Sequence, residues 1–340
     1  MSARHINIPI FIPHLGCPNM CVFCNQRSIS GKLSFDISSV ERDILQTLST
    51  VSEDDICDIA FFGGSFTGID RELMITLLDL AQKYVDSGRV KSIRLSTRPD
   101  YISEEILDIL SSYSVGTVEL GLQSMCDEVL DASRRGHTAE QAERACELIK
   151  RYGFSLIGQM MIGLPKSDVQ KEIYTANRIC ELGADGARIY PTVVFYGTEL
   201  CDMMQRDEYK PISNEEATER TKEALKVFSE HGVPCIRVGL CAGENLSDAT
   251  CVAGGANHSA IGELAMSALY LDKICESVDA IPIEKRTENL RIYCMKGEIS
   301  KVVGQKRRNI EKICQKYGLK STKVLEKSEL LRYNIIIDFI

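Results

Sequence analysis

Apolar runs of seven to ten residues alternate with amphipathic runs over roughly the first 240 residues of this 340-residue chain. The apolar runs lack clean polar alternation, which is typical of parallel strands buried on both faces. We predict strands at 6–12, 56–62, 90–96, 116–122, 154–163, 186–194 and 234–240, and helices at 40–48, 71–85, 104–113, 139–153, 168–183 and 214–232. Six strand–helix units closed by a seventh strand indicate an α/β fold, either a barrel or an open parallel sheet.

The composition is that of an ordinary globular chain, with 44% hydrophobic and 26% charged residues. No apolar run is long enough to cross a bilayer, and Met1–Pro9 lacks the apolar core of a secretory signal. We therefore expect a cytoplasmic protein without membrane contact. In that reducing compartment the fourteen cysteines would not form a disulfide framework.

The net charge of −8 is spread unevenly along the chain. Lys285–Ile340 holds fourteen Lys and Arg against six Asp and Glu, whereas residues 1–284 hold 26 basic and 42 acidic groups. A basic tail on an acidic body indicates a second module that faces a polyanion, the alternative being a solvated basic helix without a partner. We expect three parts: a barrel at 1–240, a connecting or cap segment at 241–284, and a small basic module at 285–340.

Three cysteines, Cys17, Cys21 and Cys24, lie in a polar loop directly after the first predicted strand. Loops at the carboxyl ends of such strands carry the chemistry of α/β folds. Clustered thiolates in a reducing compartment indicate zinc or an iron–sulfur centre. The other eleven cysteines do not repeat the CxxC spacing, so a structural zinc site has no second pair. Three ligands leave one metal position open, and thiols acting as buried hydrophobes are disfavoured because this loop offers no core.

This spacing, with Phe23 before the last cysteine, resembles the signature of the radical S-adenosylmethionine (SAM) superfamily. The resemblance extends over roughly residues 8–240 and implies a partial α6/β6 barrel. It also implies a [4Fe–4S] cluster, held by the three cysteines, whose open iron binds SAM. One electron from the cluster, supplied by a reductant such as ferredoxin or flavodoxin, would then cleave SAM into methionine and a 5′-deoxyadenosyl radical.

A glycine pair, Gly63 and Gly64, follows the second predicted strand in the run FFGGSFTG. Without Cβ atoms, the backbone there can approach a ligand closely, although a simple turn is the structural alternative. In the superfamily this position binds the amino group of SAM. Ser65 stands where many members have Glu, so backbone carbonyls would have to substitute for one charged contact.

Polar side chains at the ends of two adjacent predicted strands are expected to converge at one opening of the barrel. Together with the runs Arg98–Tyr101, Arg135–Thr138 and Ile189–Thr192, they resemble the radical SAM domain of the Elongator catalytic subunit, a tRNA wobble-uridine modifier, and its bacterial relatives. Elongator's acetyltransferase domain has no counterpart of that size after residue 240, so acetyl-CoA chemistry is not expected. The residues that these resemblances assign to the SAM site are Phe23, Gly63, Gly64, Ser65, Ser96, Arg98, Glu119, Gln123 and Arg188.

Two features between the barrel and the tail leave alternatives open. His258 and Glu263 lie beside a glycine turn and either line a substrate mouth or belong to a capped helix start. Cys235, Cys241 and Cys251 either ligate an auxiliary cluster or, as their loose spacing favours, are buried thiols.

The tail predicts the order strand, short helix, loop, helix, strand, strand, with the loop at Gly304–Arg307. This order resembles a minimal KH module, whose GxxG loop clamps a nucleic-acid backbone, although Arg307 replaces the second glycine. The RNA contacts predicted on this basis are Gly304, Lys306, Arg307 and Arg308. A basic structural cap for the barrel is the alternative.

These patterns predict a radical SAM enzyme that acts on an RNA base, with tRNA as the expected RNA. A second interpretation is a small-molecule enzyme, because the compact cysteine motif also resembles oxygen-independent coproporphyrinogen dehydrogenase, which acts on a porphyrinogen. A third is a non-catalytic haem or cluster chaperone on the same scaffold.

Overall fold

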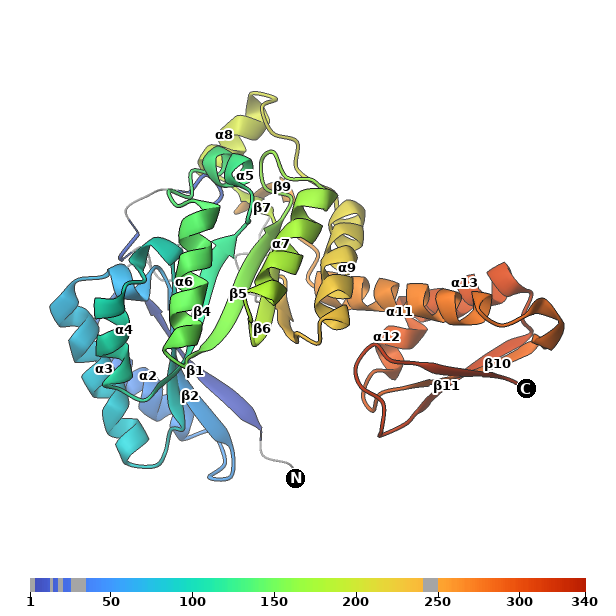
Figure 1. The fold of residues 1–340 in the computed structure, drawn as a ribbon, viewed down its shortest axis with the longest axis horizontal. Coiled ribbons are helices and arrows are strands. Elements are labelled where there is room, and N and C mark those ends of the chain that lie inside the picture. The colour runs from blue at the N-terminus through green and yellow to red at the C-terminus, as the bar shows by residue number, and fades with distance from the viewer. Residues whose placement is uncertain (1–3, 13–14, 18–20, 26–34, 241–249) are drawn as a thin grey trace.

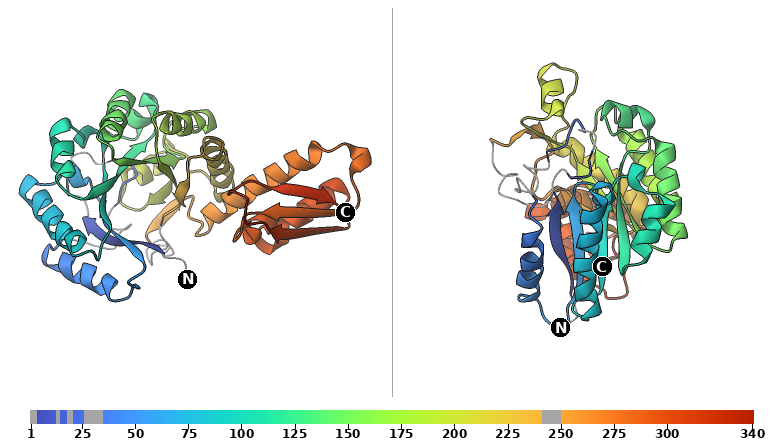
Figure 2. Two further views of the ribbon diagram at one scale, coloured as in Figure 1. Left: turned by 60° about the horizontal axis from the view of Figure 1, so that its bottom comes forward. Right: turned by 90° about the vertical axis from the view of Figure 1, so that its left-hand side faces the viewer.

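The computed structural model describes residues 4–12, 15–17, 21–25, 35–240 and 250–340. Its main body is a curled sheet of seven parallel strands with helices on the outer side (Figures 1 and 2). The strands run in the order β1-β2-β3-β4-β5-β6-β8, and within the described residues the two outer strands do not pair with each other. The body is therefore the partial barrel that we predicted. Its strands are β1 (His5–Ile12), β2 (Ile56–Gly63), β3 (Ser92–Thr97), β4 (Val115–Gln123), β5 (Ser155–Ile162), β6 (Gly186–Pro191) and β8 (Cys235–Val238).

Most of the outer helices begin at a capping side chain. Asp70 accepts a hydrogen bond from the Leu73 N–H at 3.0 Å, and Thr138 forms a capping box with Gln141. Such caps satisfy backbone donors that the first turn leaves without partners. The helices of the barrel are α2 (Ser38–Leu48), α3 (Arg71–Asp86), α4 (Glu104–Ser111), α5 (Asp127–Ala132), α6 (Ala139–Arg151), α7 (Val169–Glu181), α8 (Glu199–Gln205) and α9 (Asn214–Glu230).

The strand expected at 186–194 is broken into two. Both the N–H and the hydroxyl of Thr192 donate to the carbonyl of Ile162, at 2.9 and 2.7 Å. The chain then leaves the barrel sheet, and β7 (Val193–Phe195) pairs antiparallel with β9 (Val252–Gly255). Sequence periodicity did not show this break, because the residues on both sides of Thr192 are equally apolar.

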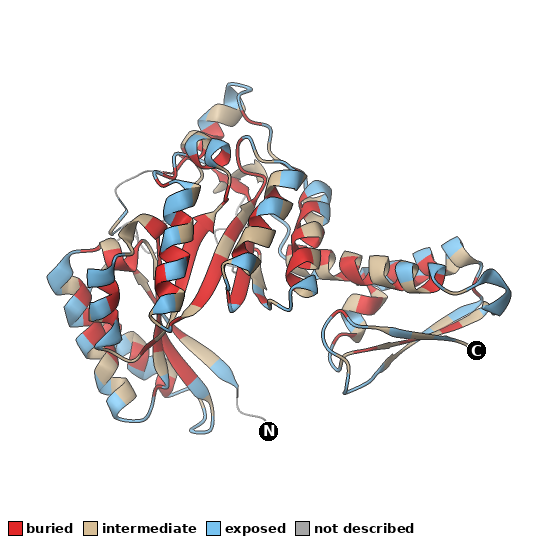
Figure 3. Ribbon diagram, viewed as in Figure 1, coloured by how far each residue is buried: buried red, intermediate tan, exposed pale blue. Residues whose placement is uncertain are grey.

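Helix α11 (Ile261–Asp279) joins the barrel to the tail. On the barrel side, the ammonium of Lys222, which is buried in α9, lies 2.6 Å from Asp272. On the tail side, the Asn309 amide donates to the Ser267 carbonyl at 2.9 Å. Buried side chains form one apolar cluster that continues from the barrel through α11 into the tail. Figure 3 shows buried residues in the barrel and along α11. The division at residues 240 and 284 stays a prediction.

The tail is a small α/β module to one side of the barrel (Figure 1). Its sheet has the order β11-β10-β12, with β11 parallel and β12 antiparallel to the central strand. The expected order of elements is confirmed: β10 (Asn289–Cys294), α12 (Ile299–Val303), α13 (Arg308–Tyr317), β11 (Ser321–Glu326) and β12 (Ile336–Phe339). None of the described helices is both long and apolar enough to span a membrane.

Candidate active site

The loop after β1 packs backbone against backbone on the turn after β2. The N–H of Gly64 donates to the Ile12 carbonyl at 2.8 Å, and a Cβ at residue 64 would lie 2.2 Å from the Leu15 carbonyl oxygen. Gly16 is equally confined, since its Cβ would lie 2.3 Å from the carbonyl of Ser65. The absence of side chains at these glycines therefore brings the cysteine loop onto the carboxyl end of β2. The SAM contacts expected of Gly63, Gly64 and Ser65 stay predictions.

Cys21 is buried, and two guanidinium groups approach its sulfur. Nη1 of Arg135 lies 3.2 Å from Sγ of Cys21, and Nη1 of Arg98 lies 3.9 Å from it. Arg98 follows β3, and Arg135 lies between α5 and α6, so residues far apart in sequence meet at this sulfur. Burial opposes the charge of Arg98, but the Asp100 carboxylate raises the pKa of the guanidinium overall. Cys21 therefore lies beside two cationic side chains.

The other side of the cysteine loop contacts the segment that follows β6. The N–H of Leu200 donates to the Val22 carbonyl at 2.8 Å, and the side chain of Asn25 reaches the Tyr196 carbonyl at 3.4 Å. Phe23 packs beside an apolar cluster that contains Val22, Val194, Leu200, Cys201 and Tyr209. The loop is therefore held between the barrel edge and the β7–α8 segment.

The three cysteines expected to hold the cluster share this loop, with Cys17 Sγ 3.8 Å from the hydroxyl of Ser65. The N–H of Cys24 donates to the Cys21 carbonyl at 3.0 Å, which closes the turn between these two residues. Within the described part of the chain, no three His, Cys, Asp or Glu side chains are grouped closely enough to hold a metal ion. The donor set still fits an iron–sulfur cluster, because thiolates are its usual ligands and the guanidinium groups offset their charge.

A charged network fills the barrel interior below this edge. Glu119 is fully buried, and its Oε1 accepts from Arg94 at 2.7 Å and from Arg188 at 2.9 Å. Its Oε2 accepts from the Gln159 amide at 3.0 Å. Arg188 also lies over the ring of Phe62, 5.4 Å from the centroid, and its buried Nε has no hydrogen-bond partner among the described atoms. Two cations thus share one carboxylate, which leaves excess positive charge in the interior.

Three of the residues predicted to bind SAM lie on β3 and β4. Ser96 and Glu119 are paired neighbours on β3 and β4, whereas Gln123 ends β4 with a φ of 69°. Glu119 acts as the counter-ion of Arg94 and Arg188, and Arg98 reaches the cysteine loop instead of the interior. The structure thus brings Arg98 to Cys21 and Arg188 to Glu119, and their SAM contacts stay predictions.

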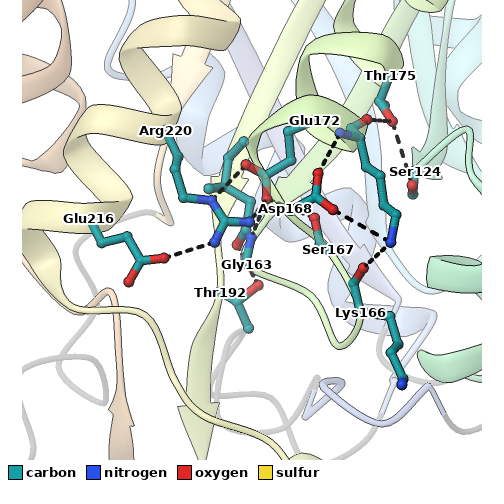
Figure 4. Close-up of polar contacts among 12 residues, drawn as sticks. Ser124, Gly163, Lys166, Ser167, Asp168, Glu172, Thr175, Thr192, Glu216 and Arg220 are labelled. Atoms are coloured by element: carbon teal, nitrogen blue, oxygen red, sulfur yellow. Dashed lines mark hydrogen bonds and ion pairs between the residues drawn. The ribbon is translucent and has the colours of Figure 1, made fainter.

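A carboxylate holds the loop that follows β5. Oε1 of Glu172 accepts from the Gly163 N–H at 2.7 Å and from the Ser167 hydroxyl at 2.8 Å (Figure 4). Arg220 of α9 binds the same carboxylate through Nε and Nη2, at 2.9 and 2.5 Å. This buried ion pair fixes the loop at the carboxyl edge of the sheet against α7 and α9.

His137 is buried behind the two arginines that approach Cys21. Its Nδ1 lies 4.0 Å from Asp100. Burial, followed by the charge of Arg135, lowers the pKa of the imidazole to about 3. His137 is therefore neutral at neutral pH and fills space beside charged neighbours.

The features between barrel and tail have local roles in the structure. Nδ1 of His258 accepts the Ala260 N–H at 3.1 Å, directly before α11, whose first turn receives no side-chain cap. The capping interpretation is therefore not met in that form, and a substrate contact for His258 stays a prediction. Cys235 is buried, and burial raises the pKa of its thiol to about 12. Cys241 lies outside the described residues, so the choice between buried thiols and an auxiliary cluster stays open. A substrate contact for Glu263 stays a prediction.

The predicted RNA loop lies between α12 and α13. Gly304 has a φ of 76°, and Lys306 and Arg307 take left-handed conformations with φ of 52° and 61°. Such conformations cost a non-glycine residue about 1–3 kcal/mol. Lys306, Arg307 and Arg308 are exposed, and none of them forms an ion pair with another described residue. The backbone of this loop thus takes conformations that favour glycine, although Arg307 stands in the place of the second glycine of the GxxG motif.

Comparison with known proteins assigns the family. Residues 11–176 match the profile of the radical SAM superfamily, and residues 184–271 match the Radical_SAM C-terminal domain. The chain belongs to the radical SAM superfamily. The resemblance seen in the cysteine motif is thereby confirmed, and this radical SAM protein is an enzyme of that superfamily.

Three relatives illustrate the likeness. The radical SAM chain is 32% identical over 201 residues to the tRNA uridine(34) acetyltransferase of Methanocaldococcus jannaschii, covering 58% of this chain and 36% of that one. It is 22% identical over 238 residues to the heme chaperone HemW of Bacillus subtilis, covering 68% and 61%. The structure of archaeal Elp3, an Elongator protein, from Methanocaldococcus infernus superposes with a TM-score of 0.63 and 23% identity, covering 81% and 64%. The chain spans about a third of the acetyltransferase, so that protein's activity is not transferred as a whole.

Sequence reasoning missed three residues of this radical SAM site: Arg135, Arg94 and Gln159. Arg135 stood within a run that carried the family likeness, but nothing local indicated that it reaches Cys21, 114 residues earlier. Arg94 and Gln159 did carry a signal, since Arg94 is the one charged residue of β3 and Gln159 is a polar residue within the mostly apolar β5. Such residues are buried only when a partner, here Glu119, is available.

Proposed function

We propose that this protein uses a [4Fe–4S] cluster and SAM to carry out radical chemistry on an RNA base, with tRNA as the substrate. The observation that carries the proposal is the basic module, which presents three exposed cations in one loop and is fixed to the barrel through α11. An enzyme that acts on a small molecule needs no such module. A polynucleotide substrate needs a surface that binds phosphates away from the reacting base.

Cys17, Cys21 and Cys24 would hold the cluster, which when bound supplies the electron that splits SAM into methionine and a 5′-deoxyadenosyl radical. The chain's own residues fix the loop: Val22 and Phe23 pack against the β7–α8 segment, and the glycine turn packs against the opposite side. Reduction requires an external donor, for which a ferredoxin or flavodoxin is suitable.

The barrel interior would bind the anionic part of SAM. Arg188 is the best-placed cation, because Glu119 is shared with Arg94 and the Nε of Arg188 has no described partner. A carboxylate bound at that position would satisfy a buried donor and gain a charge-assisted hydrogen bond. Ser96 and Gln123, at the ends of β3 and β4, would then face the sugar of SAM.

Two further observations support RNA as the substrate. The relative from Methanocaldococcus jannaschii is named for action on a tRNA uridine. The basic residues of the tail also outnumber its acidic ones by fourteen to six, which suits binding to a phosphate backbone. We also propose that the chain is divided into the barrel, a connecting segment and a module that presents RNA.

The experiment is anaerobic reconstitution of the protein with iron and sulfide, followed by incubation with SAM, dithionite and total tRNA. Digestion of the tRNA and mass analysis of its nucleosides should show a new or depleted nucleoside, together with 5′-deoxyadenosine. The matched control is Cys21→Ala, which removes one of three protein ligands and should abolish both products. If SAM is cleaved but no tRNA nucleoside changes, RNA is not the substrate.

A haem-related function is the second candidate, favoured by the likeness to the heme chaperone HemW over 68% of this chain. It predicts stoichiometric haem binding by the purified protein without turnover of any RNA. A porphyrinogen substrate instead predicts SAM-dependent decarboxylation of coproporphyrinogen in the reconstitution described above. Adding haem and coproporphyrinogen as separate arms distinguishes all three functions.

A further inference from the structure

We propose that Arg135 is a positioning residue that raises the reduction potential of the cluster through a hydrogen bond to the sulfur of Cys21. This inference rests on the cluster of the proposed function. Nη1 of Arg135 lies 3.2 Å from Sγ of Cys21, closer than Nη1 of Arg98 at 3.9 Å. The sulfur of Cys17 lies 3.8 Å from the Ser65 hydroxyl.

The orientation of Arg135 is fixed from two sides. Its Nη2 donates to the Gly121 carbonyl on β4 at 2.5 Å, and its own backbone carbonyl accepts from Nη2 of Arg98. Arg135 is 6% exposed. The guanidinium plane therefore has little freedom, and Nη1 is held toward the cysteine loop.

The charges of the two arginines differ in how they are compensated. Arg98 is paired with Asp100 through two hydrogen bonds of 2.9 Å. Arg135 forms no ion pair with a carboxylate in the described part of the chain, and its Nε is buried without a partner. An unpaired buried cation is costly, so the site requires a neighbouring anion. When Cys21 ligates the cluster, its sulfur is an anionic group within reach of Arg135.

Cys17 and Cys21 consequently have unequal surroundings. The sulfur of Cys17 meets a neutral hydroxyl, that of Ser65, at 3.8 Å. The sulfur of Cys21 meets two cations. Hydrogen bonds to cluster sulfurs and nearby charge are among the factors that set iron–sulfur potentials. A cation beside one ligand favours the reduced cluster, which carries one more negative charge, and so eases its reduction by an external donor.

The test is a redox titration of the reconstituted cluster, monitored by electron paramagnetic resonance, in wild type, Arg135→Gln and Arg135→Lys. At a fixed applied potential, the Gln variant should show a reduced-to-oxidised ratio about tenfold lower than wild type, which is about 59 mV for a one-electron couple. The Lys variant keeps the charge without the fixed fork and should fall between the two. Arg134→Gln is the matched control, because this neighbouring arginine is 62% exposed and should leave the potential unchanged.

Iron and sulfide content separates the possible failures. A wild type without a cluster overturns the proposed function and this inference with it. Full clusters with equal potentials in wild type and Arg135→Gln overturn the inference alone, as does an equal shift in the Arg134 control. If Arg135→Gln does not assemble a cluster, the comparison of wild type with Arg135→Lys decides, and equal potentials there reject the role of Arg135.

Discussion

A Cβ atom at residue 64 would lie 2.2 Å from the carbonyl oxygen of Leu15, closer than side chains approach backbone in folded proteins. Gly64→Ala should therefore displace the cysteine loop and lower the free energy of unfolding by about 1–3 kcal/mol, the usual cost of overpacking. The reconstituted variant should also hold less iron than wild type. Urea unfolding of the apo-protein and iron analysis are the two measurements.

Gly254→Ala is the control for this prediction. The nearest atom to a Cβ there is the Met204 sulfur at 3.6 Å, an ordinary contact, and both measurements should stay near wild type. Equal iron content in Gly64→Ala and wild type would mean that the loop tolerates the displacement and that the glycine pair does not position the cysteines.

Glu119→Gln should destabilise the fold strongly. The substitution leaves Arg94 and Arg188 buried without a counter-charge, and breaking a buried ion pair in this way costs about 3–5 kcal/mol. Glu208→Gln is the control, because its partner Arg206 is as exposed as Glu208 itself and such surface pairs contribute less than about 1 kcal/mol. Denaturant unfolding compares the two variants, and similar losses would contradict the role given to Glu119.

Acid should destabilise the protein through His137. Its pKa is near 6.5 in the unfolded chain and about 3 in the fold. Above pH 6.5 the imidazole is therefore neutral in both states, and its protonation does not lower the free energy of unfolding. As pH falls below 6.5, the unfolded state takes up a proton that the folded state does not. Between pH 7 and pH 5 this coupling removes about 2 kcal/mol of stability.

The measurement is urea unfolding at both pH values for wild type and His137→Gln. The variant carries no titrating group at this position, so its loss of stability on acidification should be smaller by that amount. Parallel pH dependence of the two proteins would show that His137 is not held in its neutral form.

Replacing Lys306, Arg307 and Arg308 by Ala should weaken tRNA binding and flatten its salt dependence. Each lost phosphate contact reduces the slope of log K against log salt by about 0.7 to 0.9. Binding is measured across a salt series, with SAM cleavage in the absence of RNA as the check that the barrel is intact. The control replaces Arg42, Lys83 and Lys91, three exposed cations of the barrel, and should leave both affinity and slope close to wild type.

Arg307→Gly separates binding from folding in the same loop. Glycine takes the left-handed conformation without strain, so this variant should gain about 1 kcal/mol of stability while losing one candidate phosphate contact. Weaker tRNA binding by a more stable protein could not be attributed to unfolding. Unchanged binding would make the loop a structural feature of the module.

The sequence alone determined the repeating architecture and the location of the chemistry. Short runs rich in apolar residues, without regular polar alternation, alternate with amphipathic runs, so local patterns sufficed to predict six strand–helix units. The cysteine spacing lies within eight residues and is likewise a local signal. It led to the family without reference to contacts.

Only the tertiary structure decided how distant side chains are paired. Arg135 and Cys21 are 114 residues apart, and Arg188 and Glu119 are 69 apart. Their pairing depends on the curl and register of the sheet, which no local pattern encodes. The strand break at Thr192 has the same origin, because the Ile162 carbonyl that holds Thr192 comes from a neighbouring strand. Burial makes these contacts energetically important, and burial is a property of the assembled barrel.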